Sequence, residues 1–171
     1  MVKRWLCLLL LVLLLASGCG GEKEWRRFEP EIGGFSILFP GTPEKQTETV
    51  PTAGGTIETT FFLVEQEDMG YSVNLADYSE MSLSESDVEV VLDGAREGAV
   101  RNVGGELLEE AEITLDGHPG RALKIAVDDE FVVDARFYLV GNRLYVLQAI
   151  SIGQTSKPSR VEKFLDSFQL E

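Results

Sequence analysis

Few side chains in this sequence could act as a general base, a nucleophile or a soft metal ligand. His118 is the only histidine, and it lies in the segment Asp116-Gly117-His118-Pro119. A general base works only when its geometry is held by a partner group, and a turn of this kind supplies no rigid neighbour. We therefore expect His118 to be a hairpin residue in water and not a catalytic one.

The local motifs of the common enzyme classes are absent from the sequence. It contains no G-x-S-x-G nucleophile elbow, no P-loop and no G-x-G-x-x-G phosphate loop. Zinc sites rely on histidine and cysteine, of which the chain has one and two. We expect no catalytic residue, no cofactor and no zinc. An enzyme with an unrecognised site built from Asp, Glu and Ser remains the alternative.

Calcium is harder to exclude, because it prefers oxygen ligands. The best carboxylate cluster is the acidic turn Asp128, Asp129 and Glu130, with Asp134 nearby. Its spacing does not match a calcium-binding loop, and acidic turns are usually solvated surface features. Whether calcium binds this turn stays open.

The N-terminal segment has the three-part layout of a secretory signal peptide. Lys3 and Arg4 form a positive start, an apolar run follows over 6–15, and 16–18 are small residues that lead to Cys19. The apolar run is shorter than the roughly 20 residues that span a bilayer. Cleavage before Cys19 would remove Cys7, so Cys19 would have no disulfide partner in its own chain. A buried or disulfide-bonded Cys19 behind an ordinary signal peptide is the alternative.

The stretch Ala16-Ser17-Gly18-Cys19 resembles the lipobox of bacterial lipoproteins. The resemblance implies a diacylglycerol on the Cys19 thiol, cleavage after Gly18, and a fatty acyl group such as palmitate on the new amino end. Ala16 stands where the family prefers Leu. We therefore predict a signal peptide at 1–18, a lipid-anchored tether at 19–24 and an exported, membrane-anchored protein. Gly20 favours the outer membrane in a cell with two membranes.

The charge of the chain limits its partners. The sequence has 15 basic and 29 acidic residues. Loss of Lys3 and Arg4 with the leader leaves 13 basic residues and a net charge of −16. An acidic surface repels nucleic acid and anionic headgroups. We expect no nucleic-acid partner, attachment to the membrane through lipid on Cys19, and a basic or neutral protein partner of unknown identity.

Residues 25–171 have the length of a single domain, and their first half mixes strand and helix patterns. Alternating apolar residues predict strands over 35–39, 57–64 and 71–75, and 41–55 reads as a loop or irregular edge strand. The apolar period then changes to a helical one over 84–103, behind the capping candidates Ser84 and Ser86. Gly94 and Gly98 weaken this helix, and we expect them to allow close packing on a sheet, with a contact to another helix as the alternative.

The second half contains two strong hairpin signals, Asp116-Gly117 and Gly141-Asn142. The second turn predicts a register in which Tyr138 faces Tyr145 and Leu139 faces Leu144. Both faces of that hairpin are then partly apolar, which indicates that both are covered. A last helix starts at Pro158 and presents an apolar face at Val161, Phe164, Leu165 and Phe168. These patterns predict an α+β fold, an antiparallel sheet with helices on both faces.

Four residues on or beside one face of the final hairpin form a candidate binding surface: Tyr138, Tyr145, Arg136 and Arg143. Tyrosine and arginine are common anchors in protein interfaces. The alternative is that the two tyrosines pack under a helix, where their rings would add to the core.

Three segments resemble the PsbP-like superfamily: "GFSILFPGTP", "YLVGNRLYVLQA" and "VEKFLDSFQL". This superfamily includes extrinsic proteins of photosystem II, a Ran-binding import factor and many bacterial lipoproteins. The resemblance covers roughly 28–170 and implies an α/β/α sandwich. Its members mostly bind other proteins, and none of the family's functional residues can be placed on this chain.

Together these patterns predict a membrane-anchored bacterial lipoprotein that acts as a non-catalytic binding or assembly module of the cell envelope. Two alternatives remain. One is a hydrolase or other enzyme with an unrecognised site, and the other is a passive structural lipoprotein of the envelope.

Overall fold

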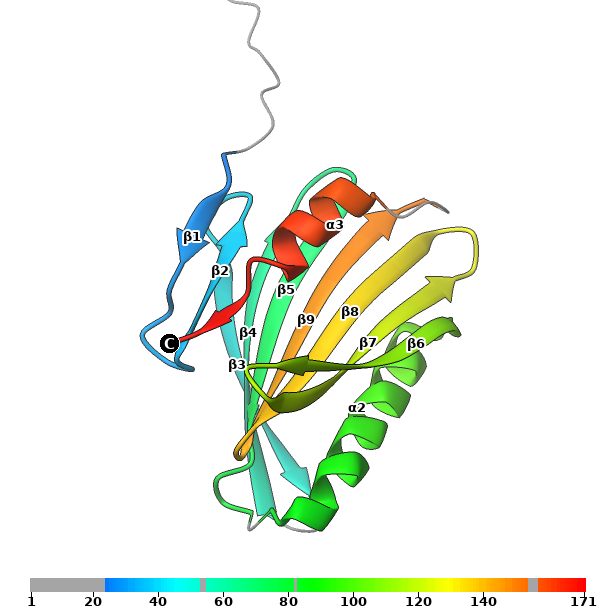
Figure 1. Cartoon of the computed structure of the whole chain (residues 1–171). Helices are drawn as coiled ribbons and strands as arrows, with labels where there is room; N and C mark the ends of the chain where they lie inside the picture. The colour runs from blue at the N-terminus through cyan, green and yellow to red at the C-terminus, as the bar shows by residue number, and fades with distance from the viewer. Residues whose placement is uncertain (1–23, 53–54, 82, 154–156) are drawn as a thin grey trace, which may run out of the picture.

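A computed structural model describes residues 24–52, 55–81, 83–153 and 157–171 (Figure 1). The predicted signal peptide at 1–18, Cys19 and the tether up to residue 23 lie outside the described residues. None of the helices within the described ranges is long and apolar enough to span a membrane.

The described chain is built on a seven-stranded sheet in the order β3-β4-β5-β9-β8-β7-β6, and every pairing in it is antiparallel. The strands are β3 (Glu44–Thr52), β4 (Gly55–Glu65), β5 (Met69–Asp77), β6 (Glu106–Leu115), β7 (His118–Val127), β8 (Phe131–Val140) and β9 (Arg143–Ile152). A mostly antiparallel sheet with two α-helices confirms the predicted α+β class.

The turn between β8 and β9 sets the register that the sequence predicts. Gly141 has a φ of 56°, as the first central residue of a type II′ hairpin turn requires. Tyr138 pairs with Tyr145 and Leu139 with Leu144. Successive side chains of a strand point to opposite faces, and β8 contributes Tyr138 to one buried cluster and Leu139 to another.

A small second sheet holds the two ends of the described chain together. It consists of β2 (Phe35–Phe39) between β1 (Arg26–Phe28) and β10 (Gln169–Leu170). The helix α3 (Pro158–Leu165) packs between this sheet and the large one, and buries Val161, Phe164 and Leu165. The prediction that Pro158 opens this helix is confirmed, and Phe168 just beyond it is also buried.

The long helix α2 (Val88–Val103) begins after a 3₁₀ turn, η1 (Glu85–Asp87). Asp87 accepts hydrogen bonds from the amide and hydroxyl of Ser84 at 2.7 and 2.6 Å, so Ser84 and not Ser86 caps η1, the 3₁₀ turn that leads into α2. Gly104 ends the helix in the left-handed conformation. Leu92 packs with the second buried cluster, against β7 and β8.

The expectation that Gly94 and Gly98 allow close packing on the sheet is wrong. A Cβ atom at either position would meet nothing within 4 Å. The two glycines lie on the part of α2 that faces away from its contacts, because Leu92, Ala95 and Ala99 carry the packing. They therefore cost helix stability and gain no close contact with the described residues.

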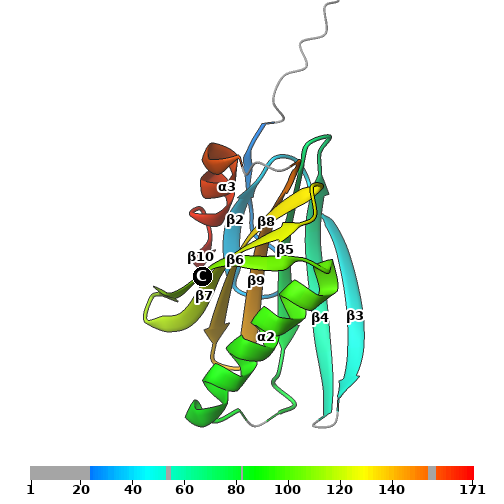
Figure 2. The same ribbon diagram turned by 90° about the vertical axis from the view of Figure 1, so that its right-hand side faces the viewer.

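The two edges of the large sheet differ. β3 forms one edge and includes Pro51 (Figure 2), which confirms the edge-strand alternative for 41–55, since proline cannot donate to a ladder. β6 forms the other edge, contains no proline, and pairs only with β7 in the described part of the chain.

Candidate functional site

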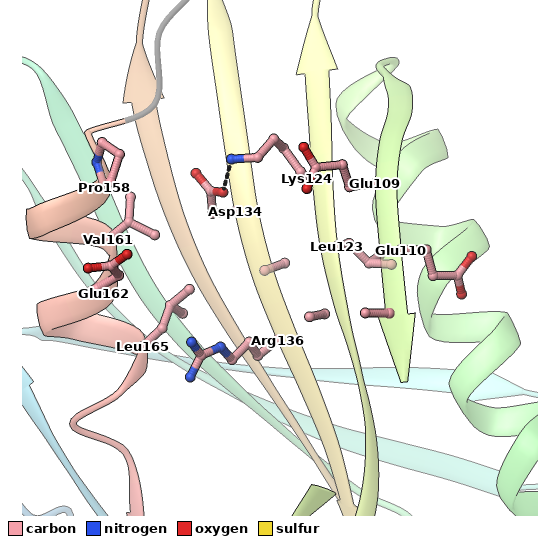
Figure 3. Close-up of a pocket in the computed structure, with 13 residues that line it drawn as sticks. Glu109, Glu110, Leu123, Lys124, Asp134, Arg136, Pro158, Val161, Glu162 and Leu165 are labelled. Atoms are coloured by element: carbon pink, nitrogen blue, oxygen red, sulfur yellow. Dashed lines mark hydrogen bonds and ion pairs between the residues drawn. The ribbon is translucent and has the colours of Figure 1, made fainter. Parts of the chain in front are cut away.

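A groove of about 310 Å³ lies between α3 and the strands β6, β7 and β8 (Figure 3). Pro158, Val161, Glu162 and Leu165 form the helix side, and the opposite margin is β6 at Glu109 and Glu110, where the Glu110 side chain points away from the groove toward α2. The floor between them consists of β7 and β8.

The groove exists because α3 is short and the neighbouring strands carry small side chains. α3 has eight residues and packs against β2, β8 and β9. Beyond its reach, Ala111 and Ala122 are cross-strand partners on β6 and β7, and both line the groove. Alanine side chains cannot fill the space that the helix leaves open, so the sheet face is hollow there.

An ion pair crosses the floor of the groove. Lys124 on β7 and Asp134 on β8 are register partners, and the Lys124 Nζ donates to Asp134 Oδ1 at 2.7 Å. The Asp134 side chain is only 12% exposed, so loss of Lys124 would leave a poorly solvated carboxylate. The pair fixes both charges on the floor.

Arg136 forms the second charged contact on the floor. It lies on β8 two residues after Asp134, and its guanidinium donates to Asp166 just beyond α3 at 2.6 Å. The adjacent Tyr138 is buried, and burial raises the pKa of its phenol, against the opposing effect of the Arg136 charge. Arg136 therefore joins the end of α3 to the sheet and borders the groove.

The structure buries two of the four residues of the predicted binding surface. Tyr138 and Tyr145 are only 5% and 2% exposed, and each is in ring contact with Phe168. The expectation that these tyrosines are presented to a partner is therefore corrected: they are core residues, as the alternative held, although the ring that covers them, Phe168, belongs to the segment after α3 and not to a helix.

The two arginines of that surface make different contacts. Arg143 is about half exposed and pairs with Asp77 on β5 at 3.4 Å, away from the groove lining. Only Arg136 lines the groove. A role of either arginine in partner binding stays a prediction.

The other candidates for chemistry do not enter the groove. His118 is the first residue of β7, and no hydrogen bond of its imidazole with the described residues is found; it is partly exposed. Asp128, Asp129 and Glu130 are exposed in the β7–β8 turn. Within the described ranges, no three His, Cys, Asp or Glu side chains are grouped so as to hold a metal ion.

Sequence reasoning missed the groove, although part of its signal was present. The acidic turn at 128–130 closes β7 and β8 into a hairpin, so Lys124 and Asp134 can be paired from the register of that hairpin. The depth of the groove could not be foreseen in this way, because it depends on where α3 ends above the sheet.

The groove is lined mainly by charged and apolar side chains. Its described lining includes no Ser, Thr, Tyr, Cys or His side chain. Its carboxylates and two cations are suited to ion pairing and hydrogen bonding.

One solved structure has a fold similar to that of this chain. The chain matches the solution structure of cyanobacterial PsbP (CyanoP) from Synechocystis sp. with a TM-score of 0.56, over 92% of this chain and 99% of that one. The fold is PsbP-like. At 16% sequence identity the likeness concerns the fold alone, and it confirms the PsbP-like fold that the three sequence segments indicate.

A second solved structure, a protein of unknown function from Pseudomonas aeruginosa, matches 75% of this chain and 83% of its own with 11% identity and a TM-score of 0.37, too low to support an inference. The sequence matches no protein-family model. No curated protein matches it either.

Proposed function

We propose that this protein is a lipid-anchored, non-catalytic protein-binding module of the bacterial cell envelope. The observation that carries the proposal is the groove beside α3, whose described lining combines carboxylates with one lysine and one arginine and contains no histidine, cysteine or hydroxyl side chain. A site of this composition is suited to holding a partner's charged side chains by ion pairs and charge-assisted hydrogen bonds.

The anchor in this proposal is Cys19. Each buried methylene of a fatty chain contributes about 0.8 kcal/mol, and stable attachment takes more than one chain. A doubly or triply acylated Cys19 would meet that requirement. Six extended residues reach at most about 20 Å, so a tether at 19–24 would keep the PsbP-like domain close to the membrane.

The layered arrangement of the domain is part of the same proposal. Along β8, Tyr138 contacts the cluster that contains α3, while Phe137 and Leu139 belong to the cluster that contains Leu92 of α2. Neighbouring side chains of a strand point to opposite faces. This alternation supports an α/β/α sandwich in which α2 and α3 cover opposite faces, so that the groove is the uncovered remainder of the α3 face.

The proposal is tested by site-specific photo-crosslinking in intact cells. A photoreactive residue replaces Glu162, which is exposed on the groove side of α3, and in a matched variant it replaces Glu48, which is exposed on β3. We expect a discrete protein adduct in the membrane fraction from position 162 and none from position 48. Equal labelling at both positions, or no protein adduct, would contradict a binding role for the groove.

A further inference from the structure

The large sheet ends at a strand whose outer side is open. β6 has ten residues, longer than the usual five to six, and in the described part of the chain it pairs only with β7. α2 and α3 pack mainly on other strands. An unpaired edge offers a row of backbone donors and acceptors to any extended chain, and proteins usually blunt such edges.

The β6–β7 turn tells which backbone groups face outward. Asp116 and Gly117 have φ values of 50° and 84°, as a type I′ turn requires, and such a turn closes on a hydrogen-bonded pair, here Leu115 and His118. Bonded and non-bonded pairs then alternate back along the strand. The amide groups of Thr114, Glu112 and Glu110 therefore face away from β7.

The charges on β6 limit which extended segments can pair with this edge of the sheet. The strand carries four exposed glutamates and no basic residue: Glu106, Glu109, Glu110 and Glu112. Like charges on directly opposed strands are destabilising, so pairing with the same edge of a second copy would place glutamates against glutamates. An extended segment that carries Lys or Arg would instead gain attraction at the same positions.

Two of these four glutamates already lie close to arginines. Glu110 lies 3.5 Å from both Arg96 and Arg121, and Glu112 lies 3.8 Å from Arg121. No ion pair of Glu109 is found among the described residues, and Glu109 lines the groove.

The groove next to β6 also carries acidic side chains. Glu162 of α3 also lines it, and within the described ranges no ion pair of Glu162 is found. The cations of the floor, Lys124 and Arg136, are held by Asp134 and Asp166. A strand added to β6 would direct every second side chain toward this face, where a Lys or Arg would meet Glu109 and Glu162.

We propose that β6 is the docking edge for an extended, basic peptide segment of a partner protein, which adds to the sheet as an eighth strand and places alternate Lys or Arg side chains over the groove. Backbone pairing supplies attachment and the glutamates select the charge of the segment, the division of roles expected for strand addition. Leu108, 52% exposed beside the irregularity in β6, offers an apolar contact at one end. This inference rests on the proposed binding function and specifies its ligand.

The first test uses the detergent-solubilised mature protein and a peptide of alternating Lys and Val, about nine residues long to match β6 at roughly 3.3 Å per residue. We expect binding by isothermal titration calorimetry. A peptide with Glu in place of Lys should not bind, and a peptide methylated at alternate backbone nitrogens should bind at least about tenfold more weakly, because it keeps its charge and loses the ladder. Equal affinity of the methylated peptide would overturn strand addition.

The second test changes the protein. The double variant Glu109→Lys/Glu162→Lys, which reverses the two groove glutamates, should weaken peptide binding by at least about tenfold, whereas Glu44→Lys/Glu48→Lys on the opposite edge strand should leave it within about twofold. Glu112→Pro and Glu112→Gln lose the same charge, but only proline loses the outward amide donor. Weaker binding of Glu112→Pro than of Glu112→Gln is therefore expected, with folding of both checked by circular dichroism.

The outcomes separate this inference from the proposed function. Loss of binding in both double variants to the same extent would mean a general charge effect and would overturn docking at β6. Failure of the Lys/Val peptide to bind, together with a specific adduct from position 162, would also overturn docking at β6 while the binding function of the protein stood.

Discussion

Tyr145 and Gly33, 112 residues apart in the chain, are joined by a buried hydrogen bond in which the phenol donates to the backbone carbonyl at 2.6 Å. The bond ties the final hairpin to the loop before β2. Gly33 has a φ of 99°, a backbone conformation that residues with a side chain rarely adopt, and a Cβ there would also lie 2.9 Å from Leu75 Cδ2, so this position of the loop favours glycine. The small sheet is thus held on the large one by a polar contact as well as by aromatic packing.

Tyr145→Phe removes only the hydroxyl of this pair. The Gly33 carbonyl would be left without its buried donor, and an unsatisfied buried group costs about 1–3 kcal/mol. We expect the free energy of unfolding in urea to fall by that amount. Tyr78→Phe is the matched control, because no hydrogen bond of the Tyr78 hydroxyl is found with the described residues, and it should change stability by less than about 0.5 kcal/mol. Equal effects would show that the Gly33 contact is not stabilising.

The local parts of this fold could be predicted from sequence, and the non-local parts could not. The β8–β9 register follows from Gly141-Asn142 because two-residue turns fix the residues that face each other. Whether Tyr138 and Tyr145 are buried depends on whether the segment at Phe168 packs over the sheet, and no local sequence pattern predicts this. The separation of β2 from the large sheet is likewise set by distant contacts, such as that of Phe35 with Phe168.

Gly94→Ala should stabilise the protein. Gly94 lies inside α2, where glycine costs about 1 kcal/mol relative to alanine, and the added methyl group would meet nothing within 4 Å. Gly120→Ala is the contrasting variant, because its Cβ would lie 2.2 Å from the Phe137 carbonyl oxygen. Thermal unfolding should show a higher midpoint for Gly94→Ala and a lower one for Gly120→Ala. A lower midpoint for Gly94→Ala would mean that α2 needs glycine for a contact beyond the described residues.

Asp68→Asn should destabilise the protein at neutral pH and have little effect in acid. The Arg160 guanidinium donates to both carboxylate oxygens at 2.9 and 2.8 Å, and this contact, opposed by desolvation and assisted by Lys157, lowers the pKa of Asp68 from its ordinary 3.8. A carboxyl whose pKa is lower in the folded state stabilises above its unfolded pKa and loses that contribution as pH falls through the folded value.

The carboxylate of Asp68 is 47% exposed, so the loss at pH 7 should be about 0.5–1 kcal/mol. Urea unfolding of Asp68→Asn and of the unaltered protein should give this difference at pH 7 and a shrinking one below about pH 4. Asp129→Asn, in the exposed β7–β8 turn, is the control and should show neither effect. A difference for Asp68→Asn that persists undiminished in acid would rule out the ion pair as its cause.

Cys19→Ala should detach the protein from the membrane without changing the stability of its domain. The expectation follows from the lipobox-like stretch 16–19 and from a cysteine that would have no partner after cleavage. Mass spectrometry of the mature protein should find Cys19 as the first residue, carrying diacylglycerol and an acyl chain, and Cys19→Ala should move to the soluble fraction or stay unprocessed. Cys7→Ala, which leaves with the leader, should be processed and anchored normally. An unmodified Cys19, or a mature chain that starts elsewhere, would show that the membrane anchor proposed for this PsbP-like domain does not exist.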